Sequence, residues 1–157
     1  SSAASDVYKR QRLNSEKSRD GQRNSLNELR LAIEPTAAAL AAQHGSPEDK
    51  EEILSLAQRL HSFEETPARR VGEQLATDLR FHTMVLHSSG NEMFAALSPF
   101  LLSMVRGRSV FGSHKRNPTA GTARLHLDLA EAIHRSDAVE AEKIARAILT
   151  AARAKEA

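Results

Sequence analysis

Apolar residues recur every three to four positions through most of the chain, which is the spacing that places them on one face of an α-helix. From residue 26 onward this pattern predicts six helices with short breaks between them, and no stretch shows the alternation typical of a β-strand. The predicted helices cover about residues 25–44, 46–63, 66–88, 91–112, 122–135 and 138–153. We therefore expect an all-α fold, an antiparallel bundle of about six helices.

The first 25 residues differ from the rest of the chain because they contain almost no aliphatic side chains. Six lysines and arginines stand there against three acidic residues. Such a segment cannot bury apolar surface, so we interpret residues 1–25 as a polar, basic tail or linker remnant and residues 26–157 as the folded domain. A DNA-contacting arm is the alternative interpretation of the same residues.

Composition limits the kind of protein this is. The 157 residues, of which 40% are hydrophobic, are enough for one domain with its own core. The chain has no cysteine, so any metal site must use His, Asp and Glu. A net charge of +2 is too weak to indicate nucleic-acid binding by the body of the chain. Without a membrane-length apolar run or a signal-like N-terminus, we expect a cytoplasmic protein with no membrane partner.

Asp78 and His82 are the most informative residues because they lie four positions apart within an apolar stripe. Residues i and i+4 share one face of a helix. The rest of that face carries Val71, Leu75, Val85 and Leu86. An unpaired polar group buried there would cost several kcal/mol, so these side chains need a partner.

A second polar residue, His126, occupies the same kind of position on a stripe with Leu129, Ala130 and Ile133. Two imidazoles and a carboxylate suit a divalent metal, and metal binding is the first interpretation to test. The alternative is an Asp–His hydrogen-bonded pair without a metal.

The sequence does not favour catalysis. It has no HExxH, no glycine-rich phosphate loop and no serine or threonine beside a candidate base in a strand-turn-helix context. Metal-assisted hydrolysis is chemically open to such a site, but it also needs a general base, which the sequence does not identify. We expect a protein that is not an enzyme.

Three separated segments carry a family resemblance: LNELRLAIEPTAAALAAQHGSPED, DLRFHTMVLHSSGNEMFAAL and HLDLAEAIHRSDAVEAEKIARAIL. In this order and spacing the chain resembles, over residues 26–149, the FCD domain, the C-terminal effector-binding domain in the FadR branch of GntR transcription regulators. The resemblance implies a helical bundle that dimerises and binds a small carboxylate metabolite over a divalent metal.

The resemblance also implies roles for individual residues. Asp78 and His82 match the first two metal ligands of the family, and His126 matches the third. Ile148 stands where the family usually has a histidine as the fourth ligand, so the site is one ligand short. Three protein ligands with water or an effector carboxylate can still hold Zn²⁺, Ni²⁺ or Mn²⁺, more weakly.

Two arginines are candidates for binding the effector. Arg30 matches a family arginine that faces the effector cavity, where its guanidinium would grip a carboxylate through two hydrogen bonds. The alternative for Arg30 is a surface arginine paired with Glu34, four residues later. Arg108 extends the apolar row of its helix by one step and could provide a second carboxylate contact, although it lies near the helix end.

The resemblance defines the expected partners and the alternatives to them. We expect a homodimer that binds a sugar acid, hydroxy acid or dicarboxylate. DNA would be contacted only through a winged helix-turn-helix, which the 25 residues before the first predicted helix are too few and too polar to form. The alternatives are a metal-dependent helical hydrolase or isomerase, and a metal-free sensor of acyl-CoA or another bulky ligand.

Overall fold

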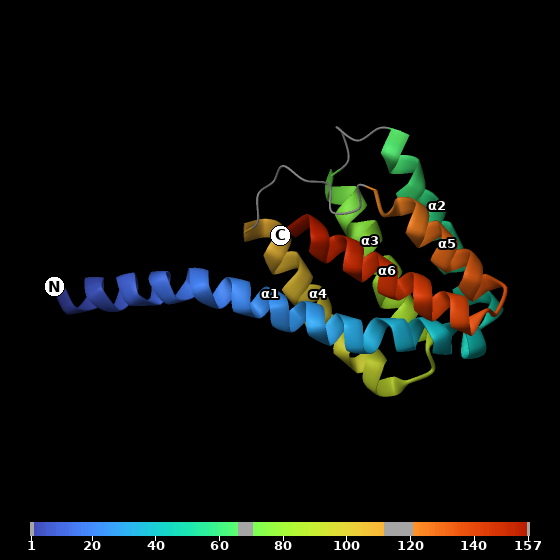
Figure 1. The fold of residues 1–157 in the computed structure, drawn as a ribbon, viewed down its shortest axis with the longest axis horizontal. Coiled ribbons are helices and arrows are strands. Elements are labelled where there is room, and N and C mark those ends of the chain that lie inside the picture. Colours follow the sequence, from blue (N-terminus) through green and yellow to red (C-terminus); the bar gives the residue numbers. More distant parts are fainter. Residues whose placement is uncertain (1, 66–70, 112–120, 157) are drawn as a thin grey trace.

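The computed structural model describes the backbone of residues 2–65, 71–111 and 121–156, with side chains from 21 to 64, 72 to 103 and 121 to 151 and those of Ala3 and Val7. The prediction of an all-α fold is confirmed, since the described residues form six α-helices and one short 3₁₀ helix (Figure 1). Their bounds are α1 Ser2–His44, α2 Pro47–Ser62, η1 Phe63–Glu65, α3 Val71–Ser88, α4 Glu92–Phe111, α5 Ala123–His134 and α6 Ala138–Glu156.

The helix starts follow from local capping. Ser46 accepts a hydrogen bond from the backbone N–H of Asp49 (3.1 Å), and Pro47 is the first residue of α2. The side chain of Asn91 accepts from the N–H groups of Met93 and Phe94 at the start of α4. Both predicted starts are therefore confirmed. The predicted start of the third helix at residues 66–67 lies outside the described residues, and α3 is described from Val71.

The N-terminal residues correct one prediction. The first helix was expected to begin at Ser25, whereas α1 runs without a break from Ser2 to His44. A lack of aliphatic side chains predicts that a segment makes no core contacts, but Lys, Arg, Gln, Glu and Ala all favour helix. In Figure 1 this part of α1 projects away from the bundle as a helix. Its assignment as a linker stays a prediction.

The third helix packs between other helices. α3 contacts α1, α2 and α4, while α6 lies along α1 and α5 packs against α2 and α6. The small side chains of α1 (Ala37, Ala38, Ala41 and Ala42) are completely buried, which lets neighbouring helices approach α1 closely. Any polar side chain that α3 directs inward is consequently surrounded by helices.

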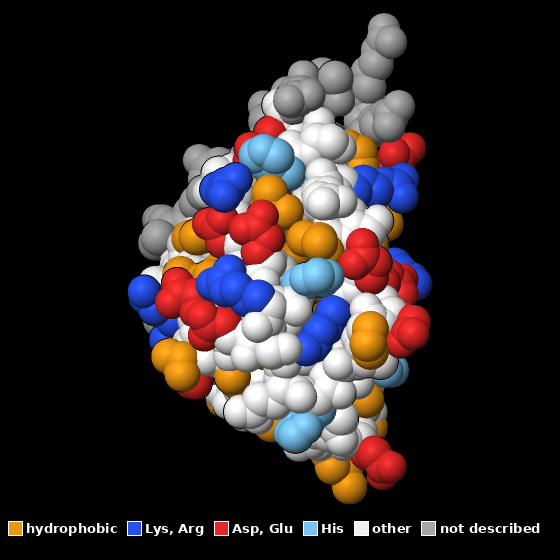
Figure 2. All heavy atoms as spheres, turned by 90° about the vertical axis from the view of Figure 1, so that its right-hand side faces the viewer, with side chains coloured by type: hydrophobic (Ala, Val, Ile, Leu, Met, Phe, Trp, Pro, Cys, Tyr) orange, Lys and Arg blue, Asp and Glu red, His pale blue; other side chains and the backbone are white. Residues whose placement is uncertain are grey.

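The surface of the bundle carries mixed charge. On the face shown in Figure 2, acidic and basic side chains are interspersed. Exposed ion pairs also join helices, such as His134–Glu51 and Arg80–Glu52. This distribution agrees with the small net charge of the chain. None of the described helices is both long enough and apolar enough to cross a membrane.

Candidate metal centre

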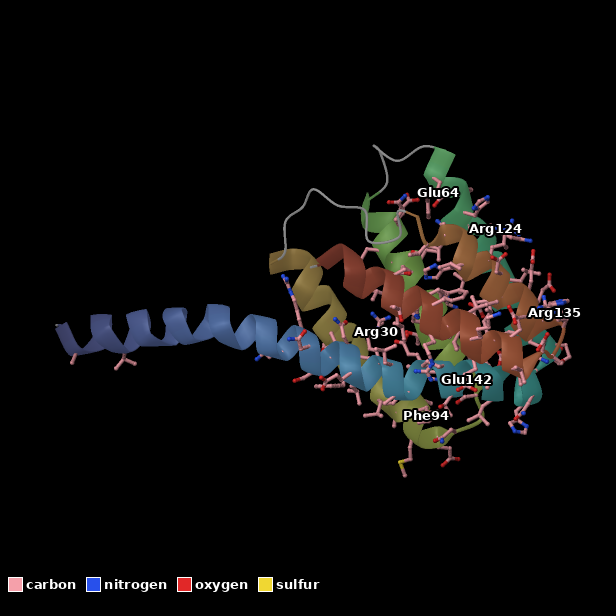
Figure 3. The ribbon with its side chains drawn as sticks, viewed as in Figure 1. Arg30, Glu64, Phe94, Arg124, Arg135 and Glu142 are labelled. Carbon is pink, nitrogen blue, oxygen red and sulfur yellow. The ribbon has the colours of Figure 1, made fainter. Side chains whose placement is uncertain are left out.

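Three helices bring polar side chains to the interior of the bundle. α3 contributes Asp78 and His82, and α5 contributes His126. Arg30 and Glu34 come from α1, and Arg30 lies on the side of that helix that faces the bundle (Figure 3). His126 is 2% exposed, and the side chains of Asp78 and His82 are each 14% exposed. The polar cluster is thus largely shielded from water.

Asp78, His82 and His126 converge on one point. The Oδ1 atom of Asp78 lies 3.0 Å from Nε2 of His126 and 3.5 Å from Nε2 of His82, and the two Nε2 atoms are 3.4 Å apart. Ligand atoms held about 2.0–2.2 Å from a tetrahedral metal are roughly 3.3–3.6 Å from one another, and adjacent octahedral ligands are slightly closer. The spacing therefore fits one divalent metal ion.

The outer partners of the two imidazoles orient their Nε2 atoms toward this point. Nδ1 of His126 is 2.7 Å from the carbonyl oxygen of Thr122, and Nδ1 of His82 is 3.1 Å from Oε2 of Glu34. Both partners only accept hydrogen bonds, so each Nδ1 carries a hydrogen. In a neutral imidazole the lone pair is then on Nε2, the atom that can bind a metal.

Asp78 provides a direct test of the fit. Its Oδ1 atom is buried and accepts no well-aligned hydrogen bond, despite the two imidazole nitrogens beside it. Two Nε2 lone pairs and a carboxylate oxygen facing each other at this distance need a shared cation, either a proton or a metal. Two imidazoles and a carboxylate are a ligand set suited to Zn²⁺, Ni²⁺ or Mn²⁺. The residues present fit such an ion.

A salt bridge from α1 completes the charged cluster. Arg30 donates to Glu34 through both Nε (2.8 Å to Oε1) and Nη2 (3.2 Å to Oε2), and both side chains are nearly buried. Burial alone would raise the pKa of Glu34, but the charges of Arg30 and His82 outweigh it and lower the pKa to about 2. Glu34 is therefore an anion at neutral pH.

The same charges act on the candidate metal-ligating groups. Burial alone would lower the pKa of His82, but the nearby carboxylates of Glu34 and Asp78 raise it to about 9. Burial also opposes ionisation of Asp78, yet the imidazoles of His126 and His82 hold the pKa of its carboxyl well below the usual range. Without a metal, a proton on His82 thus supplies the positive charge between Asp78 and Glu34.

Metal binding is expected to depend steeply on pH, since a metal must displace the proton of His82. The pKa of His82 rises from 6.5 to about 9. Its charge therefore contributes fully to the folding stability of the metal-free protein below pH 6.5, and this contribution is lost as the pH rises through 9. Because Ni²⁺ competes with this one proton for His82, the apparent Ni²⁺ affinity should fall by about tenfold per pH unit from pH 9 toward 6.5. Calorimetric titrations at several pH values measure this slope, and a flat profile would contradict it.

Two small cavities adjoin the candidate metal-ligating residues. The first is lined by Arg30, Glu34, Asp78 and His82 together with apolar side chains of α3 and α4, including Leu79, Leu86 and Leu101. Arg30, the candidate ligands and an apolar wall therefore surround one space. The second is lined by Glu34, His82, Val85, Leu129, Ala145 and Ile148.

The remaining predicted residues have different outcomes. Arg30 is not a surface arginine, although the predicted salt bridge to Glu34 is present. Ile148 is buried and lines the second cavity with His82, which is the neighbourhood expected for the position of a fourth ligand. Arg108 lies in the part of α4 whose side chains are outside the described residues. Its proposed contact with the effector stays a prediction.

Sequence reasoning did not assign Glu34 or Phe81 to the site. Glu34 was considered only as a partner of Arg30, although it lies one helical turn before the buried Ala37 and Ala38, on a face where a carboxylate needs an internal partner. Phe81 is completely buried, and its ring packs edge-on against both imidazoles, with centroids 5.5 Å from His82 and 5.1 Å from His126.

Two comparisons with known proteins, one with family models and one with solved structures, find similarity to this chain. A family model described as the FCD domain matches residues 25–151, a range that includes the whole polar cluster and Ile148. Among solved structures, one described as Streptococcus agalactiae GntR is similar, with a TM-score of 0.71 and 22% sequence identity. The similarity covers 87% of this chain and 60% of that one, so this chain spans less than two thirds of that protein. No curated protein sequence matches the chain.

Proposed function

The chain belongs to the FCD domain family, and on this basis we propose that it is the effector-binding domain of a GntR-type transcription regulator. Its effector is a small carboxylate metabolite that binds over a divalent metal. One observation carries the proposal. The possible ligand atoms of Asp78, His82 and His126 converge beside a cavity that Arg30 also lines.

Asp78, His82 and His126 would hold Zn²⁺, Ni²⁺ or Mn²⁺. The bound ion supplies positive charge and coordination positions for a carboxylate. Ile148 contributes no ligand atom where the family usually has a histidine, so the protein itself supplies three ligands. This leaves a position for water or for the effector.

Arg30 would bind the carboxylate as well. Its guanidinium has five N–H donors, of which Nε and Nη2 contact Glu34, so further donors remain for a ligand. The first cavity is small, which favours a sugar acid, a hydroxy acid or a dicarboxylate over an acyl-CoA.

The same contacts favour binding over catalysis. Apart from Asp78, the carboxylate that lines the cavity is Glu34, and its two oxygens are occupied by Arg30 and His82. A general base needs a free lone pair within reach of the substrate proton. We therefore propose a sensor that is not an enzyme.

We further propose that the domain forms a homodimer, in keeping with its family. α4 exposes Met93 and Phe100, which are seven residues apart and share one face of that helix. Exposed apolar side chains on one helix face are typical of a surface that another chain covers. Contact with DNA would come from a winged helix-turn-helix and not from the helices described above.

A thermal-shift experiment tests the proposed function. Zn²⁺, Ni²⁺ or Mn²⁺ should raise the unfolding temperature of the protein stripped of metal. Sugar acids, hydroxy acids and dicarboxylates should then be screened with and without the metal, and at least one should stabilise only the metal-loaded protein. If none of the three metals stabilises the protein, the proposal is wrong.

Arg30→Ala should weaken binding of the carboxylate found in this screen by about 1.5–3 kcal/mol, the range for hydrogen bonds to charged groups. Arg30→Lys should restore only part of the affinity, because an ammonium cannot form the two parallel bonds of a guanidinium. Calorimetry with metal-loaded protein measures both values. Arg80→Ala is the matched control, since Arg80 also pairs with a glutamate but is exposed. Equal affinities for the Arg30 and Arg80 variants would exclude Arg30 from the effector site.

A further inference from the structure

Glu34 lies between the arginine of the cavity and a metal-ligating histidine. Its Oε1 accepts from Nε of Arg30 at 2.8 Å, while its Oε2 is 3.2 Å from Nη2 of Arg30 and 3.1 Å from Nδ1 of His82. The Glu34 side chain is only 6% exposed. A carboxylate so deeply buried, with N–H donors at both of its oxygens, is held in one orientation.

Glu34 is not placed to bind the metal itself. It contacts Nδ1 of His82, whereas the atom that faces Asp78 and His126 is Nε2, on the opposite side of the ring. Among the described residues, the group whose ligand atoms lie within 4.8 Å of one another consists of Asp78, His82 and His126. Glu34 therefore belongs to the outer shell of the site.

The two imidazoles differ in the kind of group that holds them. His126 is held by a backbone carbonyl, that of Thr122, which no side-chain substitution removes. His82 is held by the side chain of Glu34. An outer partner on Nδ1 fixes the tautomer and the ring orientation and makes Nε2 a stronger ligand. The geometry of His82 toward a metal therefore depends on Glu34.

We propose that Glu34 is a positioning residue for the metal centre: it holds His82 with Nε2 directed at the metal, and Arg30 holds Glu34 in turn. This inference rests on the proposed function, because it presupposes that Asp78, His82 and His126 bind a metal. It extends that function by connecting the cavity arginine to a metal ligand through one carboxylate. A ligand that draws Arg30 away from Glu34 then also changes how firmly His82 is held.

Titration with Co²⁺ tests the role of Glu34, since its visible absorption reports both affinity and coordination geometry. Glu34→Ala should lower the Co²⁺ affinity by about 10–100-fold, the range for loss of an outer-shell partner. Glu34→Gln should be less impaired, because its amide oxygen still accepts from Nδ1 but carries no charge. The absorption spectrum at saturation should match that of the wild type. Glu52→Gln is the control, as Glu52 pairs with Arg80 at the surface.

The outcomes separate this inference from the proposed function. Wild-type protein that binds no Co²⁺ would overturn both. Wild-type binding with unchanged affinity in the Glu34 variants would overturn the inference alone, as would a changed spectrum, which would make Glu34 a ligand.

A further variant and a spectroscopic measurement guard against a loss of folding. Removing Glu34 alone leaves Arg30 buried without its partner. The double variant Arg30→Met/Glu34→Gln avoids this because it removes both charges, and it should show the same loss of Co²⁺ affinity as Glu34→Gln. In Zn²⁺-loaded wild-type protein, nitrogen NMR should find His82 protonated on Nδ1. Protonation on Nε2 would overturn the inference.

Discussion

Replacing His126 with alanine is expected to weaken the binding of Ni²⁺ by more than about 100-fold, beyond the range that follows loss of an outer-shell partner. Its Nε2 atom lies 3.0 Å from Oδ1 of Asp78 and 3.4 Å from Nε2 of His82, so the substitution removes one of three converging ligand atoms. Two protein ligands then remain, too few for a stable transition-metal site. Isothermal calorimetry at pH 8 measures the change.

His134→Ala is the matched control for this prediction. His134 is on the same helix two turns later, and it is exposed and paired with Glu51 at the surface. Its replacement should leave the Ni²⁺ affinity unchanged. If the His126 and His134 variants bind Ni²⁺ equally well, the converging residues are not a metal centre.

Replacing Phe81 with alanine is expected to lower the free energy of unfolding by about 3–5 kcal/mol, the cost of deleting a buried aromatic ring. The ring is completely buried and belongs to the core cluster. It also packs edge-on against both ligand imidazoles, so its loss leaves space in which His82 and His126 can turn. We therefore expect weaker metal binding in this variant as well, at temperatures where it remains folded.

Chemical denaturation with and without Ni²⁺ measures both effects of the Phe81 substitution. Val139→Ala is the control, since Val139 is 81% exposed at the start of α6 and should change stability by less than about 0.5 kcal/mol. A Phe81 variant whose stability is within that range would contradict the assigned packing.

Helical periodicity was sufficient to predict much of the fold and the convergence of Asp78, His82 and His126. Asp78 and His82 are close in sequence, so the four-residue spacing alone places them on one face of α3. His126 is far away in the chain, but its position on an amphipathic stripe of α5 directs it into the same core. Capping residues such as Ser46 and Asn91 set two helix starts through contacts within four residues. All of these are local properties.

The features that sequence did not predict depend on contacts between distant residues or on weak preferences. Glu34 reaches His82 only because α1 packs beside α3, and its four-residue spacing from Arg30 indicated no more than a salt bridge. The start of α1 at Ser2 was missed because a polar segment without core contacts was taken for a linker, although its residues favour helix.

The length of α1 has a mechanical consequence. The helix carries Arg30 and Glu34 inside the bundle and continues to Ser2, 28 residues away. At about 1.5 Å per residue, the arm from Arg30 to its far end is roughly 42 Å long. A rigid arm of this length that pivots by about 10° moves its tip by roughly 7 Å. A slight tilt of α1 beside Glu34 would therefore become a large displacement at Ser2, outside the bundle.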